Sequence, residues 1–192
     1  MVPGDTLTRD GCLAYLARAH PGIHVGGKTA LSWRGIRHNV SFRETVTLWG
    51  QGQLNLPEWL TSRFACTYQT TRLFDADLPA SFGVQPLPGG HAEVLVSAPE
   101  RALLELLSDI GKTASLEEAR ALVESTHNLR TPVLETLLTH TTRIKVLRLA
   151  RALAEEFDLP WAPLAKVHSE KKGGGARWIA VTKSGERLDL KP

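Results

Sequence analysis

Apolar and polar positions are patterned most clearly between residues 93 and 110. The apolar run at residues 94–96 predicts a short buried strand. Beyond it, apolar side chains recur at helical spacing and would share one face of a helix: Leu103, Leu106, Leu107 and Ile110. A strand that leads directly into an amphipathic helix is a core-forming unit, and we expect it at the centre of the fold.

The start of this helix has the spacing of a capping box. Ser97 precedes Glu100 by three residues, so its hydroxyl can accept from the backbone N–H of Glu100 while the Glu100 carboxylate accepts from the N–H of Ser97. Pro99 suits the first helical turn, where a backbone N–H is not needed. Arg101 and Glu105 are four residues apart and predict an ion pair outside the apolar stripe. We predict no reactive group in this unit.

The first half of the chain predicts short helices and a small sheet. Thr8 suits the N-cap of a helix that ends at Pro21, and residues 29–33 suit a second helix that ends at Gly35. β-Branched, aromatic and turn-forming residues predict two strands, at 45–49 and 64–68, and two irregular segments, at 50–57 and 75–91.

The second half predicts mainly helices. Ser115 and Glu118 repeat the capping-box spacing, and Thr131 with Pro132 begins another helix. The longest predicted helix spans residues 142–157. Its apolar side chains share one face: Val146, Leu147, Ala150, Leu153, Ala154 and Phe157.

The C-terminal residues predict a loop and a hairpin. Residues 170–175, rich in lysine and glycine, predict a flexible loop, and residues 177–182 and 187–190 predict two paired strands. The order of elements predicts an α+β fold in a single domain over residues 1–192. Its parts are a mixed α/β part with a small sheet, a helical part, and a basic loop with a β-hairpin, at residues 1–96, 97–163 and 164–192.

The composition is that of an ordinary globular domain, with 42% hydrophobic and 22% charged residues. No apolar run approaches the ~20 residues that span a bilayer, and the N-terminus has no signal-peptide pattern. Two cysteines, Cys12 and Cys66, are too few for a disulfide framework. His20 and His24 have the spacing of two metal ligands on one helix, but Pro21 breaks the helix that would bring them to one ion. We expect a cytoplasmic protein with no membrane partner, metal or cofactor.

The net charge of +3 is unevenly distributed. Residues 91–140 carry 4 Lys and Arg against 8 Asp and Glu, whereas residues 141–192 carry 11 against 6. Lys145, Arg148 and Arg151 fall opposite the apolar face of their helix, with Glu155 among them. With further basic residues they form a candidate nucleic-acid surface: Lys171, Lys172, Arg177 and Lys183. A charged face that is merely solvated is the alternative.

Residues 22–29 match G-x-x-x-x-G-K-[ST], the pattern of a phosphate-binding P-loop. In that motif backbone N–H groups surround the phosphates, the lysine neutralises them and the hydroxyl binds magnesium. The candidate nucleotide-binding residues are Gly22, Gly27, Lys28 and Thr29. The preceding residues read as a helix rather than the required buried strand, so a glycine-rich turn before a short helix is the alternative. We do not predict an enzyme.

Six short motifs together resemble one family, the AbiEi-type antitoxins of bacterial type IV (abortive-infection) toxin–antitoxin systems. They occur in the family's order from about Thr6 to near the C-terminus: HVGGKTAL at 24–31, LPEW at 56–59, SAPERALLELL at 97–107, NLR at 128–130, KVLRL at 145–149 and LPW at 159–161. Each motif alone is a packing or capping signature, and their order over one chain makes the resemblance.

The resemblance implies a phage-defence protein that counteracts a cognate nucleotidyltransferase toxin without catalysis and usually without a stable complex. Such antitoxins commonly carry an N-terminal winged helix-turn-helix that binds promoter DNA for autoregulation. This chain begins where that domain would end, so we expect it to lack the domain. The alternatives are a regulator that binds DNA or RNA through the basic residues and a nucleotide-dependent enzyme centred on Lys28.

Overall fold

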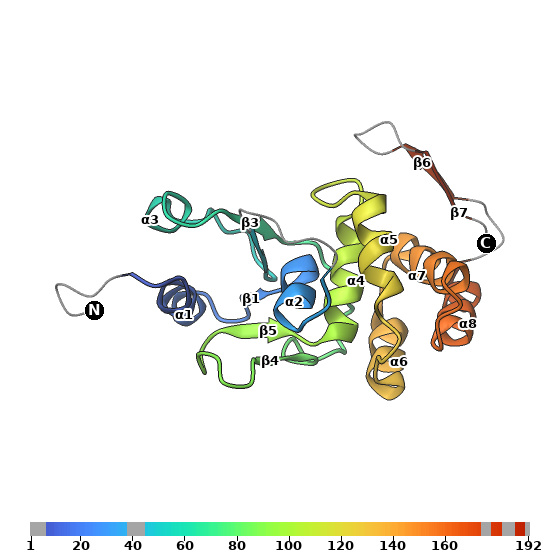
Figure 1. Cartoon of the computed structure of the whole chain (residues 1–192), viewed down its shortest axis with the longest axis horizontal. Coiled ribbons are helices and arrows are strands. Elements are labelled where there is room, and N and C mark those ends of the chain that lie inside the picture. Colours follow the sequence, from blue (N-terminus) through green and yellow to red (C-terminus); the bar gives the residue numbers. More distant parts are fainter. Residues whose placement is uncertain (1–6, 38–44, 174–177, 182–186, 191–192) are drawn as a thin grey trace.

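The computed structural model describes residues 7–37, 45–173, 178–181 and 187–190, with side chains as far as residue 172. Its fold is α+β, as the sequence predicts (Figure 1). The N-terminal helices and the sheet form one end of the molecule, and the later helices form the other.

A five-stranded mixed sheet forms within the first half of the chain, in the order β3-β2-β1-β5-β4. β1 is antiparallel to β2 and parallel to β5, β2 is parallel to β3, and β4 is antiparallel to β5. The strands span His24–Val25 (β1), Val46–Trp49 (β2), Cys66–Gln69 (β3), Val84–Pro86 (β4) and Leu95–Ser97 (β5). The short strand β1 is thus the central strand, between β2 and β5.

Three helices accompany the sheet: α1 (Arg9–Ala19), α2 (Gly27–Trp33) and α3 (Glu58–Thr61). Thr8 caps α1 as predicted, because its hydroxyl accepts from the N–H of Gly11 at 3.1 Å. α2 begins two residues earlier than predicted and starts directly after β1, so the glycine pair of the sequence lies at a strand-to-helix turn.

Five helices and a hairpin follow. They span Pro99–Asp109 (α4), Leu116–Glu124 (α5), Thr131–His140 (α6), Ile144–Glu156 (α7), Ala162–Gly173 (α8), Trp178–Val181 (β6) and Arg187–Leu190 (β7). β6 and β7 pair antiparallel, which confirms the predicted hairpin strands, and the residues between them lie outside the described part. Ser115 caps α5 through the N–H of Glu118 at 3.0 Å, also as predicted.

α4 is the central element of the core. Every residue from Glu100 to Asp109 is buried, because α2 packs on one side of α4 and α5, α6 and α7 pack on the others. A helix that is buried all round cannot keep a solvated face. Arg101 and Glu105, predicted to pair outside the apolar stripe, therefore pair inside the protein, at 8% and 0% exposure.

Three other predictions about local structure are wrong. The N-cap of α4 is Ala98, because the Ser97 hydroxyl donates to Glu105 and the Glu100 carboxylate binds Arg130, so no capping box forms. Residues 170–173, predicted as part of a flexible loop, are the last turn of α8. The irregular segment at 75–91 contains β4, which pairs with β5 and is short enough to leave little sequence signal.

Candidate functional site

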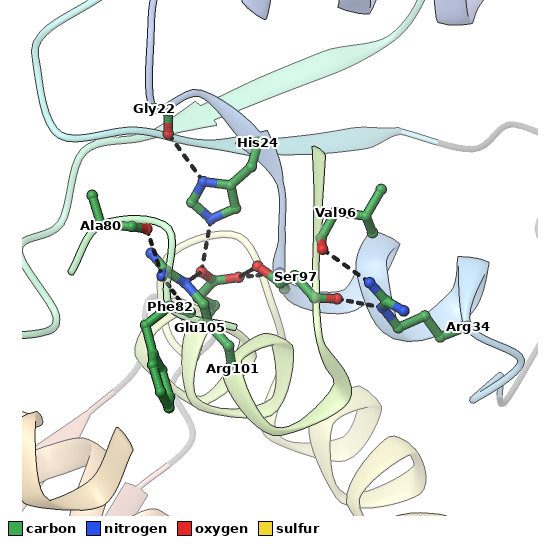
Figure 2. Close-up of polar contacts among 10 residues, drawn as sticks. Gly22, His24, Arg34, Ala80, Phe82, Val96, Ser97, Arg101 and Glu105 are labelled. Carbon is green, nitrogen blue, oxygen red and sulfur yellow. Dashed lines mark hydrogen bonds and ion pairs between the residues drawn. The ribbon is translucent and has the colours of Figure 1, made fainter. Parts of the chain in front are cut away.

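The best-defined polar site is centred on the Glu105 carboxylate in the middle of α4 (Figure 2). Oε1 accepts from His24 Nε2 and Arg101 Nε, both at 2.9 Å. Oε2 accepts from the backbone N–H of Gly27 at 3.0 Å and from Ser97 Oγ at 2.8 Å. These five residues, here called the Glu105 cluster, come from β1, α2, β5 and α4. The carboxylate thus accepts four hydrogen bonds, which is its full capacity.

The Arg101 and His24 side chains of the cluster are held by backbone carbonyls as well. Arg101 donates from Nη1 to the carbonyl oxygens of Ala80 at 2.9 Å and Phe82 at 2.7 Å. His24 places Nδ1 3.1 Å from the carbonyl oxygen of Gly22 while Nε2 faces Glu105. The two ring nitrogens of His24 are thus held between a backbone carbonyl and the Glu105 carboxylate.

Two adjacent glycines allow the turn after β1 to approach the carboxylate. A Cβ at Gly26 would lie 2.3 Å from Glu105 Oε2 and 2.6 Å from Trp49 Cδ1. Gly27 adopts φ of 53°, in the left-handed region that favours glycine, and in that conformation its N–H donates to Glu105. The HVGGKTAL and SAPERALLELL motifs of the sequence therefore meet at one carboxylate.

The Glu105 carboxylate remains charged inside the protein. Burial by itself would raise the pKa of Glu105, but the charge and hydrogen bond of His24, followed by those of Arg101, lower it to about 2. The carboxylate is therefore ionised at neutral pH, and its ion-pair partner on α4 is Arg101. A group so fully engaged acts as an internal brace, since it has no lone pair left for a substrate.

A second buried carboxylate, Asp109, lies one helical turn beyond Glu105. Its Oδ1 has no hydrogen-bond partner among the described residues, although Lys112, Lys145 and Lys28 lie near enough to influence its charge. Burial raises the pKa of Asp109 to about 7, against the attraction of Lys112 and with a further contribution from the charge of Glu105.

The structure engages the P-loop-like residues in internal contacts. The Gly22 carbonyl faces His24, and the Gly27 N–H binds Glu105. Lys28 Nζ donates to Glu118 at 3.0 Å. Thr29 Oγ1 donates to the Thr45 carbonyl and accepts from the Thr47 N–H. The Glu105 carboxylate thus occupies the position beside the Gly27 N–H that a phosphate oxygen would take in a P-loop.

The predicted basic residues do not form one open face. Arg148 is buried at 4% exposure, and Arg151 pairs with Glu155 at 3.0 Å and Glu170 at 3.6 Å. At these positions α8 packs against α7, so the polar face of α7 becomes part of an interface between the two helices. Lys171 is exposed, Lys172 donates to the carbonyls of Thr139 and Thr141, and Arg177 and Lys183 lie outside the described residues.

A different group of cations gathers at the junction of α4 and α7, and sequence reasoning missed two of its three members. Lys112 follows α4, whereas Arg143 and Lys145 begin α7. Burial lowers the pKa of Lys145, and the charges of Lys112 and Arg143 lower it further. Burial and Arg143 also lower the pKa of Lys112. We call these three the junction cations; their separation in the chain leaves no periodic signal.

Among the described residues, no three His, Cys, Asp or Glu side chains form a group that could hold a metal ion. In the same part of the chain, no helix is both long and apolar enough to cross a membrane.

Comparison with known proteins identifies two family models and one fold. A model described as "Transcriptional regulator, AbiEi antitoxin, Type IV TA system" matches residues 43–190, and one described as "Transcriptional regulator, AbiEi antitoxin N-terminal domain" matches residues 1–42. The solved structure of the RV2827C protein from Mycobacterium tuberculosis is similar, with a TM-score of 0.58 and 14% identity over 93% of this chain and 68% of that chain. At that identity the likeness shows the fold alone. No curated protein matches.

The match at residues 1–42 corrects one prediction, because the chain was expected to lack the family's N-terminal domain. The described part of this segment forms α1, β1 and α2, and β1 supplies the central strand of the sheet. With both models matched, the chain belongs to the AbiEi antitoxin family of type IV toxin–antitoxin systems, whose models describe it as a transcriptional regulator.

Proposed function

We propose that this chain counteracts a cognate nucleotidyltransferase toxin without catalysing a reaction itself and without forming a stable complex with the toxin. The match of residues 43–190 to the AbiEi antitoxin model carries this proposal. A non-catalytic mode is supported by the Glu105 cluster, in which the carboxylate, His24 and Arg101 bind one another and are almost fully buried.

The nucleophiles of the described chain also favour a non-catalytic mode. Burial raises the pKa of Cys12 and of Cys66, so both remain protonated thiols at neutral pH. The thiolate is the reactive form of cysteine, and within the described part of the chain no base is hydrogen-bonded to either free thiol. Antitoxin activity would then depend on the folded surface.

Co-expression with the neighbouring toxin tests this proposal. We expect the intact chain to restore growth and not to co-purify with the toxin. The Lys28→Gln variant, which removes the lysine of the P-loop-like pattern, should restore growth equally well because Lys28 only bridges to Glu118 at the surface. Failure of the intact chain to restore growth contradicts the antitoxin role, and failure of the folded Lys28→Gln variant alone points to nucleotide chemistry.

A second function, nucleic-acid binding by the junction cations, is favoured by one observation. Beyond the effect of burial, the charges of Lys112 and Arg143 lower the pKa of Lys145, and the charge of Arg143 lowers the pKa of Lys112, so the fold keeps like charges close together. Phosphate groups would relieve this repulsion, and contacts of this kind do not depend on base sequence. The family's description as a transcriptional regulator suits such a surface.

The Lys112→Gln/Arg143→Gln double variant tests the second function and leaves Lys145, which donates to the Ile110 carbonyl, in place. Its affinity for promoter DNA should fall, and the slope of log K against log salt should decrease by about 1–2. Lys166→Gln, at an exposed lysine on α8, is the matched control. Equal salt slopes for the double variant and the control would show that the junction cations do not contact the DNA.

A further inference from the structure

Asp109 is a buried carboxylate that takes no part in the Glu105 cluster. It is the last residue of α4 and is only 3% exposed, and its Oδ1 has no hydrogen-bond partner among the described residues. Its other oxygen, Oδ2, lies 3.7 Å from the position that a Cβ would take at Gly27. A buried carboxylate that lacks hydrogen bonds is costly to ionise unless positive charge lies nearby. Compensation for its charge must therefore come from cations on neighbouring segments.

Three lysines supply positive charge around Asp109, and each is attached beside it. The backbone N–H of Lys112 donates to the Asp109 carbonyl at 2.9 Å. The Lys145 ammonium, from the first turn of α7, donates to the carbonyl of Ile110, the next residue along the chain. Lys28 directly follows Gly27 on α2. The attraction of these lysines opposes the rise in the pKa of Asp109 that burial causes.

The other charged groups on the helices around α4 either repel Asp109 or bind elsewhere. Glu105, one turn earlier on α4, adds negative charge that raises the pKa of Asp109 further. From α5, Glu118 accepts from Lys28 at 3.0 Å and so engages that ammonium. His140, on α6, lies against a carboxylate that follows β3. The strongest attractions on Asp109 are thus those of Lys112 and Lys145, two of the junction cations.

The junction cations face solvent as well as Asp109. Lys112 is exposed, and Arg143 and Lys145 are half-buried, so phosphate groups can reach them. We infer that Asp109 is a resident counter-charge of the junction cations and competes with nucleic-acid phosphates for them. Nucleic acid then binds more tightly when Asp109 is uncharged, because a negative charge beside the site offsets part of the attraction. This inference rests on the proposed nucleic-acid binding.

Asp109→Asn in the intact chain tests the inference, because the amide replaces the carboxylate with a neutral group of the same shape. Its affinity for a fluorescein-labelled DNA duplex at pH 8, measured by fluorescence anisotropy, should be about fivefold higher than that of the unmodified chain. Asp158→Asn is the matched control, because it removes the same charge at an exposed position just beyond the opposite end of α7. It should bind as the unmodified chain does. Equal affinities of the unmodified chain and folded Asp109→Asn would overturn the inference.

The pH dependence of binding gives a second readout, which a purely structural role of Asp109 would not produce. Because burial raises the pKa of Asp109 to about 7, the affinity of the unmodified chain should fall about fivefold between pH 6 and pH 8. By the same linkage, binding at pH 7 should take up protons, which calorimetry in buffers of different ionisation enthalpy measures. Asp109→Asn should lose most of both effects.

The outcomes separate the two proposals. An equal decline of affinity and equal proton uptake in the unmodified chain and Asp109→Asn would overturn the role of Asp109 while leaving nucleic-acid binding in place. If the unmodified chain bound no DNA at either pH and Asp109→Asn bound none, the nucleic-acid function itself would be contradicted, and this inference with it.

Discussion

Glu105 and Asp109 lie four residues apart on α4 and are both buried, yet their pKa values move in opposite directions. Desolvation raises both, but the cations and donors around Glu105 lower its pKa to about 2, whereas that of Asp109 rises to about 7. The same helix therefore holds one carboxylate ionised and the other near its midpoint at neutral pH.

The difference lies in the donors that other elements supply. Glu105 is reached by donors from β1, α2, β5 and its own helix. Near Asp109, the lysine ammonium groups donate elsewhere: Lys28 to Glu118, Lys112 to Thr71 and Lys145 to the Ile110 carbonyl. Positive charge at a distance stabilises a buried carboxylate less than hydrogen bonds aimed at its oxygens.

The largest effect should come from Glu105→Gln. The substitution keeps the shape but leaves the Arg101 guanidinium buried without a counter-charge, so we expect a loss of about 3–5 kcal/mol in the free energy of unfolding. Urea denaturation at pH 7 measures it. Glu117→Gln, at an exposed position of α5, should change stability by less than about 0.5 kcal/mol and serves as the control. Similar losses in both variants would mean that the cluster does not brace the core.

The pH dependence of the free energy of unfolding should reveal the titration of Asp109. The pKa of Asp109 is raised from 3.8 to about 7, so its contribution is complete below pH 3.8 and is lost as the pH rises through 7. We expect this group to remove about 3 kcal/mol of stability between pH 4 and pH 8. Asp109→Asn should abolish that decline and be more stable than the unmodified chain at pH 8. An unchanged decline in the variant would mean that another group titrates.

Glu105 affects stability at acidic pH instead, because its lowered pKa adds stability above pH 4.5 that is lost as the pH falls toward 2.

A smaller effect should follow from Gly26→Ala. The added methyl would meet Glu105 Oε2 at 2.3 Å and Trp49 Cδ1 at 2.6 Å, so the cluster must move to accept it. We expect a loss of about 1–3 kcal/mol, measured by thermal or urea denaturation. Gly52→Ala is the matched control, because a Cβ there meets nothing within 4 Å. If both substitutions had the same effect, the close approach of the turn to Glu105 would be unimportant.

The smallest effect should come from Lys28→Gln, which removes the partly exposed bridge to Glu118. Exposed ion pairs contribute little, so we expect a loss below about 1 kcal/mol that diminishes in high salt. A loss as large as that of Glu105→Gln would show that Lys28 stabilises Asp109 more strongly than its contacts indicate. Denaturation of the two variants at low and high salt separates these outcomes.

Much of the local structure was predictable because its causes are local. Thr8 and Ser115 cap their helices, Pro99 and Pro132 begin theirs, and the apolar stripe of α7 is buried as its spacing predicts. Ser97 and Glu100 show where prediction from local spacing is limited. Their spacing satisfies a capping rule, but Glu105 and Arg130 compete for the same side chains and prevail.

The sequence by itself determined the α+β class, most element positions and the family, since periodicity, caps and the order of short motifs are all properties of neighbouring residues. Only the tertiary structure decided which charges are internal. His24 and Gly27 reach Glu105 across 81 and 78 residues of chain, and α8 covers the arginines of α7 that spacing alone placed in solvent. The state of a charged group depends on desolvation and on donors brought from distant segments, and neither quantity is encoded in the spacing of residues along one helix.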